Sequence, residues 1–482
     1  MTRALAGLAV LTLSVAGPRP ASVAAQTISA AQVQAVDRLF EDPDRDEAPG
    51  CTIEVRRDGQ PVIGRSFGLA NLEWRMPVRR FTLFEVGSVA KQFTAAAVAV
   101  LAVQGKLSLD DDVHRFLPEL PDYGTPVTLR QMLTHTSGLR DWTDIEEMNN
   151  RPRALHVHSQ ADVLRIMSRQ KTLNFRPGTE FLYSNSNYNL LAMVVERASG
   201  MSFADFTTKT LFEPLNMSDT QWRTDASAVV EQRAEAYARK GEGDWRKDMW
   251  AETVVGAGGL ISSVPDLMLW NEALTDPGPA NAAWVAMIQQ PGRLADGRAI
   301  TYALGLFVLS VDGTAIVAHS GAAGGYRAFL GRIPSRKISA GILCNGSGFD
   351  TATLGMKVLH AFIDPPPTEP TPALPSDVAV FSAKAPSGPP WTPVARDLAG
   401  FAGAYAGAEA ETVFRATVRG DKLVLTDDQG NAAELTPLSQ DVFQYPGSSW
   451  VMTFTRNGAG EITGFGASTA RTRNLRFERV RG

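Results

Sequence analysis

Apolar and polar residues alternate at both ends of the first 350 positions. In CTIEVRRDGQPVIGRSFG (51–68), alternating apolar positions flank Asp58-Gly59, a dipeptide typical of a tight β-turn. This segment therefore predicts a β-hairpin. The segments TAIVAHSG, GYRAFLGRIPS and KISAGILCNG, which follow residue 313, have the apolar and β-branched composition of strands.

Between these strands the apolar residues follow the spacing of helices. SVAKQFTAAAVAVLAV (88–103) is apolar nearly all round, which indicates a buried helix. The segment 185–200 predicts another helix, closed by Gly200, and Ser263 with Asp266 forms the capping pattern that begins a third. Helices placed between an early hairpin and late strands predict an α+β fold, with an antiparallel sheet and flanking helices.

The composition changes beyond residue 363. DPPPTEPTPALP and APSGPPWTP are rich in proline and cannot pack as helix or central strand, so 364–394 is predicted to be an extended linker. Residues 395–482 contain short strand-like segments separated by turn signals such as Asn457-Gly458. They predict a small antiparallel β-barrel. The larger domain is expected to span residues 26–363.

The first 25 residues have the pattern of a cleaved signal peptide. Arg3 precedes the apolar stretch ALAGLAVLTLSVAG, and small residues follow up to Ala25. No later stretch is long and apolar enough to span a membrane. We therefore expect a mature chain that is periplasmic or secreted, with no membrane span.

Charge and cysteine content exclude several classes of function. The net charge of −4 and the absence of a basic cluster argue against a nucleic-acid partner. Cys51 and Cys344 are too few for a disulfide framework or a metal cluster. Two buried free thiols are the favoured prediction, although an oxidising compartment would permit one bridge. No motif suggests a metal or another cofactor, so none is expected.

The motif S-x-x-K occurs twice, in different settings. Ser168 and Lys171 lie at the polar end of an amphipathic segment, where the lysine favours the helix C-terminus and indicates a surface residue. Ser88 and Lys91 instead begin the buried helix, on one face of it. Burial and the positive helix end both disfavour the charged form of Lys91, which suits it to take a proton from Ser88. The alternative is a lysine whose amine reaches solvent.

Two later motifs supply groups that complement this pair. Tyr183-Ser184-Asn185 precedes a buried helix, and a tyrosine beside a lysine can relay protons. His319-Ser320-Gly321 ends a strand, where glycine permits close approach of a substrate. Taken singly, Tyr183 is as well explained as a core aromatic residue, and His319 as a structural one. His135 is expected to be a structural residue at a helix end.

The order S-x-x-K, Y-x-N, H-x-G closely resembles that of the penicillin-recognising serine hydrolases. Within them the chain is similar to the group of class C β-lactamases, D-alanyl-D-alanine carboxypeptidases, D-aminopeptidases and related esterases. The similarity includes the segments MLTHTSGL and FLYSNSNYNLLAMVVERASG and covers about residues 33–363. It implies a β-lactamase/transpeptidase-like fold. The C-terminal segment resembles a small barrel appended to some members.

The resemblance also implies a role for each residue. Ser88 would be the acylated nucleophile, Lys91 its base and Tyr183 the proton relay. Backbone N–H groups of Ser88 and Ala322 would form the oxyanion hole. The substrate-binding residues would be Asn185, His319, Ser320 and Gly321.

The expected activity follows from these roles. We predict a secreted serine hydrolase that acts through an acyl-enzyme on small amides or esters, with D-amino-acid peptides, peptidoglycan fragments or carboxylic esters as substrates. Many β-lactamases have lysine where this chain has His319, which makes a β-lactamase the second hypothesis. A catalytically silent peptide- or penicillin-binding protein is the third. The oligomeric state is left open.

Overall fold

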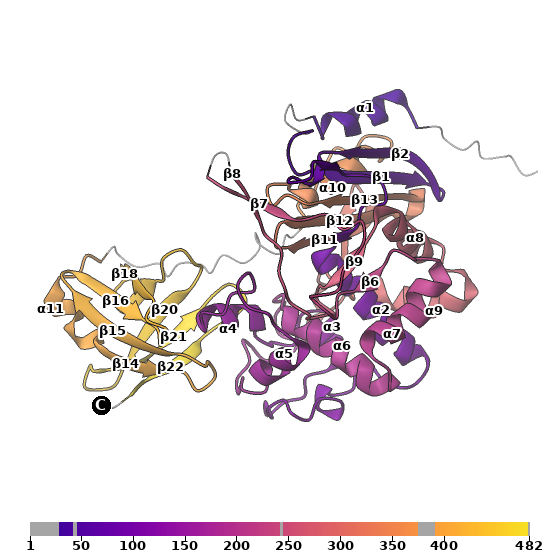
Figure 1. Cartoon of the computed structure of the whole chain (residues 1–482). Coiled ribbons are helices and arrows are strands. Elements are labelled where there is room, and N and C mark those ends of the chain that lie inside the picture. Colours follow the sequence, from indigo (N-terminus) through magenta and orange to yellow (C-terminus); the bar gives the residue numbers. More distant parts are fainter. Residues whose placement is uncertain (1–27, 42–45, 242–243, 375–390, 481–482) are drawn as a thin grey trace, which may run out of the picture.

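The structure is a computed structural model, and it describes residues 28–41, 46–241, 244–374 and 391–480. The predicted signal peptide and much of the predicted linker lie outside these residues. No helix in the described ranges is both long and apolar enough to cross a membrane. Figure 1 shows a large sheet-and-helix part and a separate C-terminal β-structure beside it.

The main sheet has six antiparallel strands in the order β10-β11-β12-β13-β1-β2. The predicted hairpin is confirmed, because β1 pairs with β2 around Asp58 and Gly59, whose φ angles are 49° and 74°. The strands are β1 (Cys51–Arg57), β2 (Gln60–Phe67), β10 (Phe307–Val311), β11 (Thr314–Ala323), β12 (Tyr326–Ile333) and β13 (Ile338–Cys344). The N-terminal hairpin thus joins the sheet beside its last strand.

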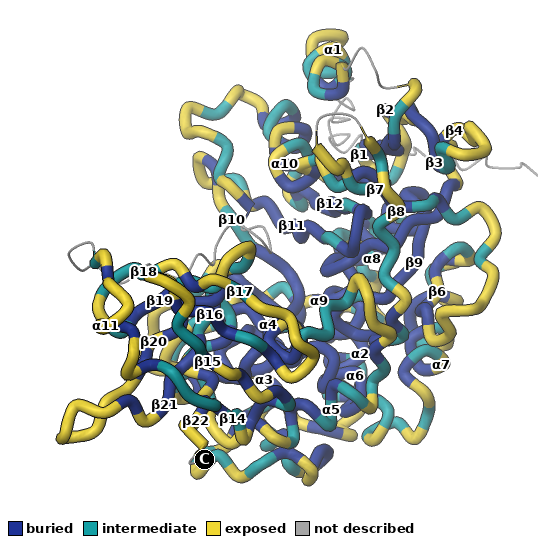
Figure 2. The backbone as a smooth tube through the Cα atoms, turned by 60° about the vertical axis from the view of Figure 1, so that its left-hand side comes forward, coloured by how far each residue is buried: buried dark blue, intermediate teal, exposed yellow. Residues whose placement is uncertain are grey.

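Helices cover both faces of this sheet. On one face, Phe329 and Ile342 pack in a cluster with α1 (Ala30–Arg38) and α10 (Thr351–His360). On the other face, Leu330 and Leu343 pack with α8 (Val264–Thr275) and α2 (Lys91–Val103). Alternate residues of a strand therefore pack into two different hydrophobic cores, one on each face of the sheet. Figure 2 shows that the central strands of this sheet are largely buried. The expected α+β fold is confirmed.

A helical layer on the second face surrounds α2. The predicted helix α6 (Asn185–Ser199) ends where Gly200 takes a left-handed φ of 74°, and the side chain of Ser263 caps α8. The other helices of this region are α3 (Leu129–Leu133), α4 (Trp142–Met148), α5 (Gln160–Met167), α7 (Phe203–Thr207) and α9 (Gly278–Ile288). Short helical turns complete it: η1 (Gly87–Ala90), η2 (Val113–Arg115), η3 (Thr208–Phe212) and η4 (Glu213–Leu215). A further turn, η5 (Pro334–Arg336), joins β12 to β13.

The described residues also form three small sheets outside the main sheet. β5 (Phe84–Glu85) pairs with β9 (Leu260–Ser262), which also pairs with β6 (Gln221–Trp222). This pairing places the chain just before η1 next to β9. The remaining pairs are β3 (Leu69–Asn71) with β4 (Met76–Pro77), and β7 (Tyr237–Lys240) with β8 (Asp244–Lys247).

The C-terminal segment forms the predicted antiparallel barrel. Its nine strands run in the order β17-β16-β15-β14-β22-β21-β20-β19-β18, and the two end strands are separated in sequence by Leu435 alone. The sheet therefore curls until its edges approach each other. After α11 (Ala395–Leu398) and η6 (Ala399–Phe401), the strands are β14 (Gly403–Ala406), β15 (Val413–Arg419), β16 (Lys422–Thr426), β17 (Ala432–Glu434), β18 (Thr436–Ser439), β19 (Val442–Gln444), β20 (Val451–Arg456), β21 (Ile462–Ser468) and β22 (Leu475–Val480).

The barrel docks on α4 and α5, as Figure 1 shows. Met148 of α4 packs into the aromatic core of the barrel, and the buried Arg140 forms an ion pair of 3.0 Å with Glu409. Nearby, Lys171 is exposed and Ser168 ends α5. The second S-x-x-K motif is thus a surface feature, as its sequence predicts.

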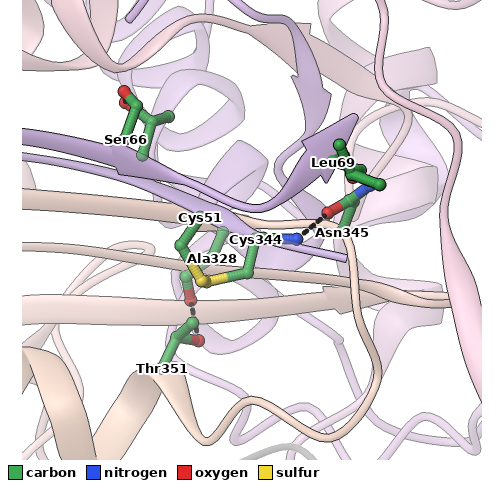
Figure 3. Close-up of a disulfide and its surroundings, with 9 residues drawn as sticks. Cys51, Ser66, Leu69, Ala328, Cys344, Asn345 and Thr351 are labelled. Atoms are coloured by element: carbon green, nitrogen blue, oxygen red, sulfur yellow. Dashed lines mark hydrogen bonds between the residues drawn. A yellow bond between two sulfur atoms is a disulfide. The ribbon is translucent and has the colours of Figure 1, made fainter. Parts of the chain in front are cut away.

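The prediction of two free thiols is wrong, because Cys51 and Cys344 form a disulfide. The two residues face each other in the antiparallel pair β1–β13, with Cα atoms 4.1 Å apart. Figure 3 shows the bridge beside Asn345, whose amide donates a hydrogen bond to the carbonyl oxygen of Leu69. Strand register sets this pairing, and a sequence separation of 293 residues hides it from local patterns.

The disulfide predicts that denatured, unreduced protein has no free thiol, and that reduction releases two. Because the bridge closes a loop of 293 residues, replacing both cysteines by alanine should lower the free energy of unfolding by about 2–4 kcal/mol. Thiol titration and denaturant unfolding measure these effects. Two reactive thiols before reduction would contradict the bridge.

Candidate active site

Ser88 and Lys91 lie at the junction of a short turn and a buried helix. Ser88 belongs to η1, and Lys91 is the first residue of α2. Ser88 is 5% exposed and Lys91 is completely buried. The turn keeps the two side chains on one side of the chain, and the Lys91 Nζ lies 3.0 Å from the Ser88 Oγ.

Three oxygens surround the Lys91 Nζ. Besides Ser88 Oγ, these are the amide Oδ1 of Asn185 at 2.9 Å and the carbonyl oxygen of Ala257 at 2.8 Å. Two of the acceptors carry no proton, so they must receive hydrogens from the lysine. A neutral Lys91 that donates to these two acceptors can accept the hydrogen of the Ser88 hydroxyl. A lysine amine in this arrangement can act as a base toward the serine hydroxyl.

Asp141 holds Asn185 in this orientation. Its Oδ2 accepts hydrogen bonds from the Asn185 backbone N–H at 2.9 Å and from the side-chain Nδ2 at 3.1 Å. Burial works to raise the pKa of Asp141, but the charge of Arg471 and hydrogen bonds from Asn185 and Thr143 outweigh it and lower this pKa. Asp141 is thus a buried carboxylate one hydrogen bond away from Asn185.

Tyr183 lies in an aromatic cluster behind the lysine. The Lys91 Nζ is 4.8 Å from the centre of the Tyr183 ring, and the His135 ring is 4.2 Å from it. Burial is the main cause that lowers the pKa of His135 well below its usual value. His135 also accepts a hydrogen bond from the Ser184 N–H at its Nδ1. It is therefore a neutral ring that supports Tyr183.

His319 is buried on β11, and its two ring nitrogens have different partners. Nδ1 lies 2.6 Å from the carbonyl oxygen of Ser320, which can only accept, so Nδ1 carries a hydrogen. Nε2 lies 3.1 Å from the hydroxyl of Tyr302 and can accept from it in the neutral ring. Ser320 and Gly321 border a separate hollow of about 280 Å³ toward α10, so the third motif is divided between two environments.

A cavity of about 160 Å³ opens in front of Ser88. Ser88, Asn185 and Ala322 reach it, whereas Lys91, Tyr183 and His319 are not among its lining residues. Its other lining residues come from several elements: Glu85, Gly87, Trp142, Arg153, Asn189, Trp250, Val254, Ala257, Gly258, Ala323 and Arg471. Burial raises the pKa of Glu85 against the opposing charge of Arg223.

The end of β11 lies directly against η1. A Cβ atom placed on Gly321 would be 2.1 Å from the Val86 carbonyl oxygen and 2.9 Å from the Ser88 nitrogen. One placed on Gly87 would be 2.5 Å from the Ala322 nitrogen. Only glycine permits this approach, which places the backbone nitrogens of Ser88 and Ala322 on adjoining segments beside the cavity.

Several residues of the site have no motif in the sequence. Asp141 is the N-cap of α4, a place where aspartate is common for structural reasons. Trp142 follows it, and its indole N–H donates to Asn189 at 2.9 Å. Arg471 comes from the barrel, 327 positions from its partner Asp144. In the sequence, a capping aspartate beside a tryptophan is only a weak indication of a functional site, and nothing around Arg471 indicates one.

The chain matches the profile of the family described as Beta-lactamase over residues 36–364. It is 32% identical over 292 residues to penicillin-binding protein 4* of Bacillus subtilis, an alignment that covers 58% of this chain and 64% of that protein. It is 28% identical over 304 residues to a D-aminopeptidase of Gluconobacter oxydans, covering 63% and 57% respectively. The chain thus spans less than two thirds of the length of these relatives.

Solved structures have the same fold. The octameric penicillin-binding protein homologue of Pyrococcus abyssi superimposes with a TM-score of 0.60 at 24% identity, covering 92% of this chain and 98% of that one. The crystal structure of SurE gives a TM-score of 0.56 at 26% identity, covering 93% and 99%. With the family profile matching most of the chain, we conclude that this protein belongs to the Beta-lactamase family of serine hydrolases.

Proposed function

We propose that the protein is a hydrolase that forms an acyl-enzyme on Ser88 and cleaves small amides or esters. The observation that supports this most directly is the position of the Lys91 Nζ, 3.0 Å from the Ser88 Oγ and fixed by two further acceptors. A base held in this way is ready to accept the serine proton without rearrangement. Its complete burial favours the neutral amine that the reaction needs.

The proposed reaction has two stages. Lys91 takes the hydroxyl proton while the Ser88 Oγ attacks the substrate carbonyl carbon, and the carbonyl electron pair becomes an oxyanion. The N–H groups of Ser88 and Ala322 stabilise that oxyanion. When it collapses, the bond to the leaving group breaks, and Tyr183 passes the proton to that group. Water then attacks the ester on Ser88, which releases the acid and restores the hydroxyl.

We propose D-amino-acid amides or short D-peptides as the preferred substrates, with carboxylic esters as the second class. Relatives named D-aminopeptidase support the first class. A cavity of about 160 Å³ with Trp142 and Trp250 in its lining has room for a small acyl group. Because His319 carries no permanent charge, a β-lactam carboxylate lacks the cation that many β-lactamases provide at this position, so we place β-lactamase activity after both of these classes.

We also propose that the mature protein works outside the cytoplasm. The N-terminal segment has the pattern of a signal peptide, and the bridge between Cys51 and Cys344 is favoured in an oxidising compartment.

The first prediction for this site concerns Ser88 and Lys91. Replacing Ser88 by alanine should abolish labelling by a fluorophosphonate, and replacing Lys91 by methionine should slow labelling by about 10²–10⁴-fold because the base is lost. Intact-mass spectrometry measures the adduct. Turnover of a D-alanyl amide, a p-nitrophenyl ester and nitrocefin would rank the substrates.

The second S-x-x-K motif supplies matched controls. Ser168→Ala and Lys171→Met make the same chemical changes at the surface and should leave labelling unchanged. A wild-type protein that stays unlabelled by both a fluorophosphonate and a fluorescent penicillin would contradict the acyl-enzyme and favour a silent binding protein.

A further prediction concerns the contact between β11 and η1. Gly321→Ala should slow labelling of Ser88 on the order of 100-fold, because the new Cβ displaces the backbone that carries the nucleophile. Gly348→Ala is the control, since a Cβ there meets no atom within 4 Å and its φ is not left-handed. Equal labelling rates in the two variants would show that this contact is not required.

A further inference from the structure

The barrel contributes a side chain to the cavity in front of Ser88. The loop between β21 and β22, residues 469–474, leaves the barrel and lies against the region around α4. Its residue Arg471 borders the cavity together with Ser88, Asn185 and Trp142, and its side chain is 21% exposed. The site is therefore built from both parts of the chain.

Arg471 pairs with two acidic residues at the start of α4. Its Nη1 lies 3.3 Å from the Asp141 Oδ2, and its Nη2 lies 3.2 Å from the Asp144 Oδ1. Asp141 is completely buried, and removing the partner of a buried charge leaves it uncompensated. Burial raises the pKa of Asp144 even though Arg471 opposes the shift, whereas the pKa of Asp141 is lowered. Among the groups that lower the pKa of Asp141, the charge of Arg471 contributes most, so it favours the ionised carboxylate.

The charge on Asp141 decides which way the Asn185 amide points. An ionised carboxylate only accepts, so it draws both the backbone N–H and the Nδ2 of Asn185 toward its Oδ2. The Oδ1 of Asn185 is thereby left facing the Lys91 Nζ at 2.9 Å. A reversed amide would point its hydrogens at the lysine, which already donates to Ala257.

We propose that Arg471 is a positioning residue for the reaction at Ser88, acting through Asp141 and Asn185 on Lys91. The sequence of contacts is continuous: guanidinium to carboxylate, carboxylate to amide, amide to amine, and amine to hydroxyl. This inference rests on the proposed acyl-enzyme function. It adds that a residue of the barrel influences the rate at which Ser88 reacts.

The loop is held in place by contacts that do not use the Arg471 side chain. The Arg473 N–H donates to the side chain of Asn174 at 2.7 Å, and Arg140 donates to the carbonyl oxygens of Arg473 and Asn474 at 3.2 and 3.1 Å. The Thr469 hydroxyl donates to Asp144. Replacing the guanidinium should therefore leave the barrel docked.

The test compares the rate at which Ser88 is labelled by a fluorophosphonate in the full-length chain. Arg471→Gln should slow labelling about 10–100-fold, and Arg471→Lys should recover part of that loss because it restores the charge. Arg473→Gln is the matched control, since its side chain pairs with Glu180 at the surface, where both groups are more than 40% exposed. It should label at the wild-type rate.

A double-mutant cycle separates positioning from simple docking. If Arg471 acts through Asp141, then Arg471→Gln should change the rate less than twofold in an Asp141→Asn background. Equal losses in both backgrounds, or an Arg471→Gln variant that labels like the wild type, would overturn the inference. A wild-type protein that is not labelled at all would instead overturn the proposed function.

Discussion

The candidate active site depends on one buried amine, that of Lys91, and on the oxygens around it. The Lys91 Nζ lies among a hydroxyl, an amide oxygen and a backbone carbonyl oxygen, each from a different segment. Because the amine is shielded from water, no solvent molecule can replace a lost partner. The positions of α2, α6 and the segment before β9 are therefore linked through this single atom. The apolar helix around Lys91 is needed to keep that environment dry.

Asp141 connects the surroundings of Lys91 to the barrel. It accepts hydrogen bonds from Asn185 on one side and pairs with Arg471 on the other, so it contacts both the candidate site and the barrel. Buried ion pairs add little net stability, but they penalise arrangements in which one partner is missing. The barrel interior is filled by aromatic side chains such as Phe454 and Phe465.

The features that the sequence predicted correctly are those that short-range patterns determine. The hairpin around Asp58, the buried helix after Ser88 and the glycine at the end of α6 all follow from spacing within a few residues. The disulfide and the contact of Arg471 with Asp141 could not be predicted in this way, because each depends on which distant segments become neighbours in the fold. Likewise, the H-x-G motif gave the right strand but not the separate environments of His319 and Ser320. Side-chain direction at a strand end depends on tertiary packing.

The place of β1 in the main sheet has a consequence for how the protein is made. The hairpin β1–β2 is synthesised early, yet among the described residues the strand it pairs with is β13, the last strand of that sheet to emerge. Contacts so distant in sequence form slowly, since a long loop must close first. The hairpin has to wait with one edge unpaired while nearly three hundred residues follow. The main sheet is therefore completed only after β13 has been synthesised.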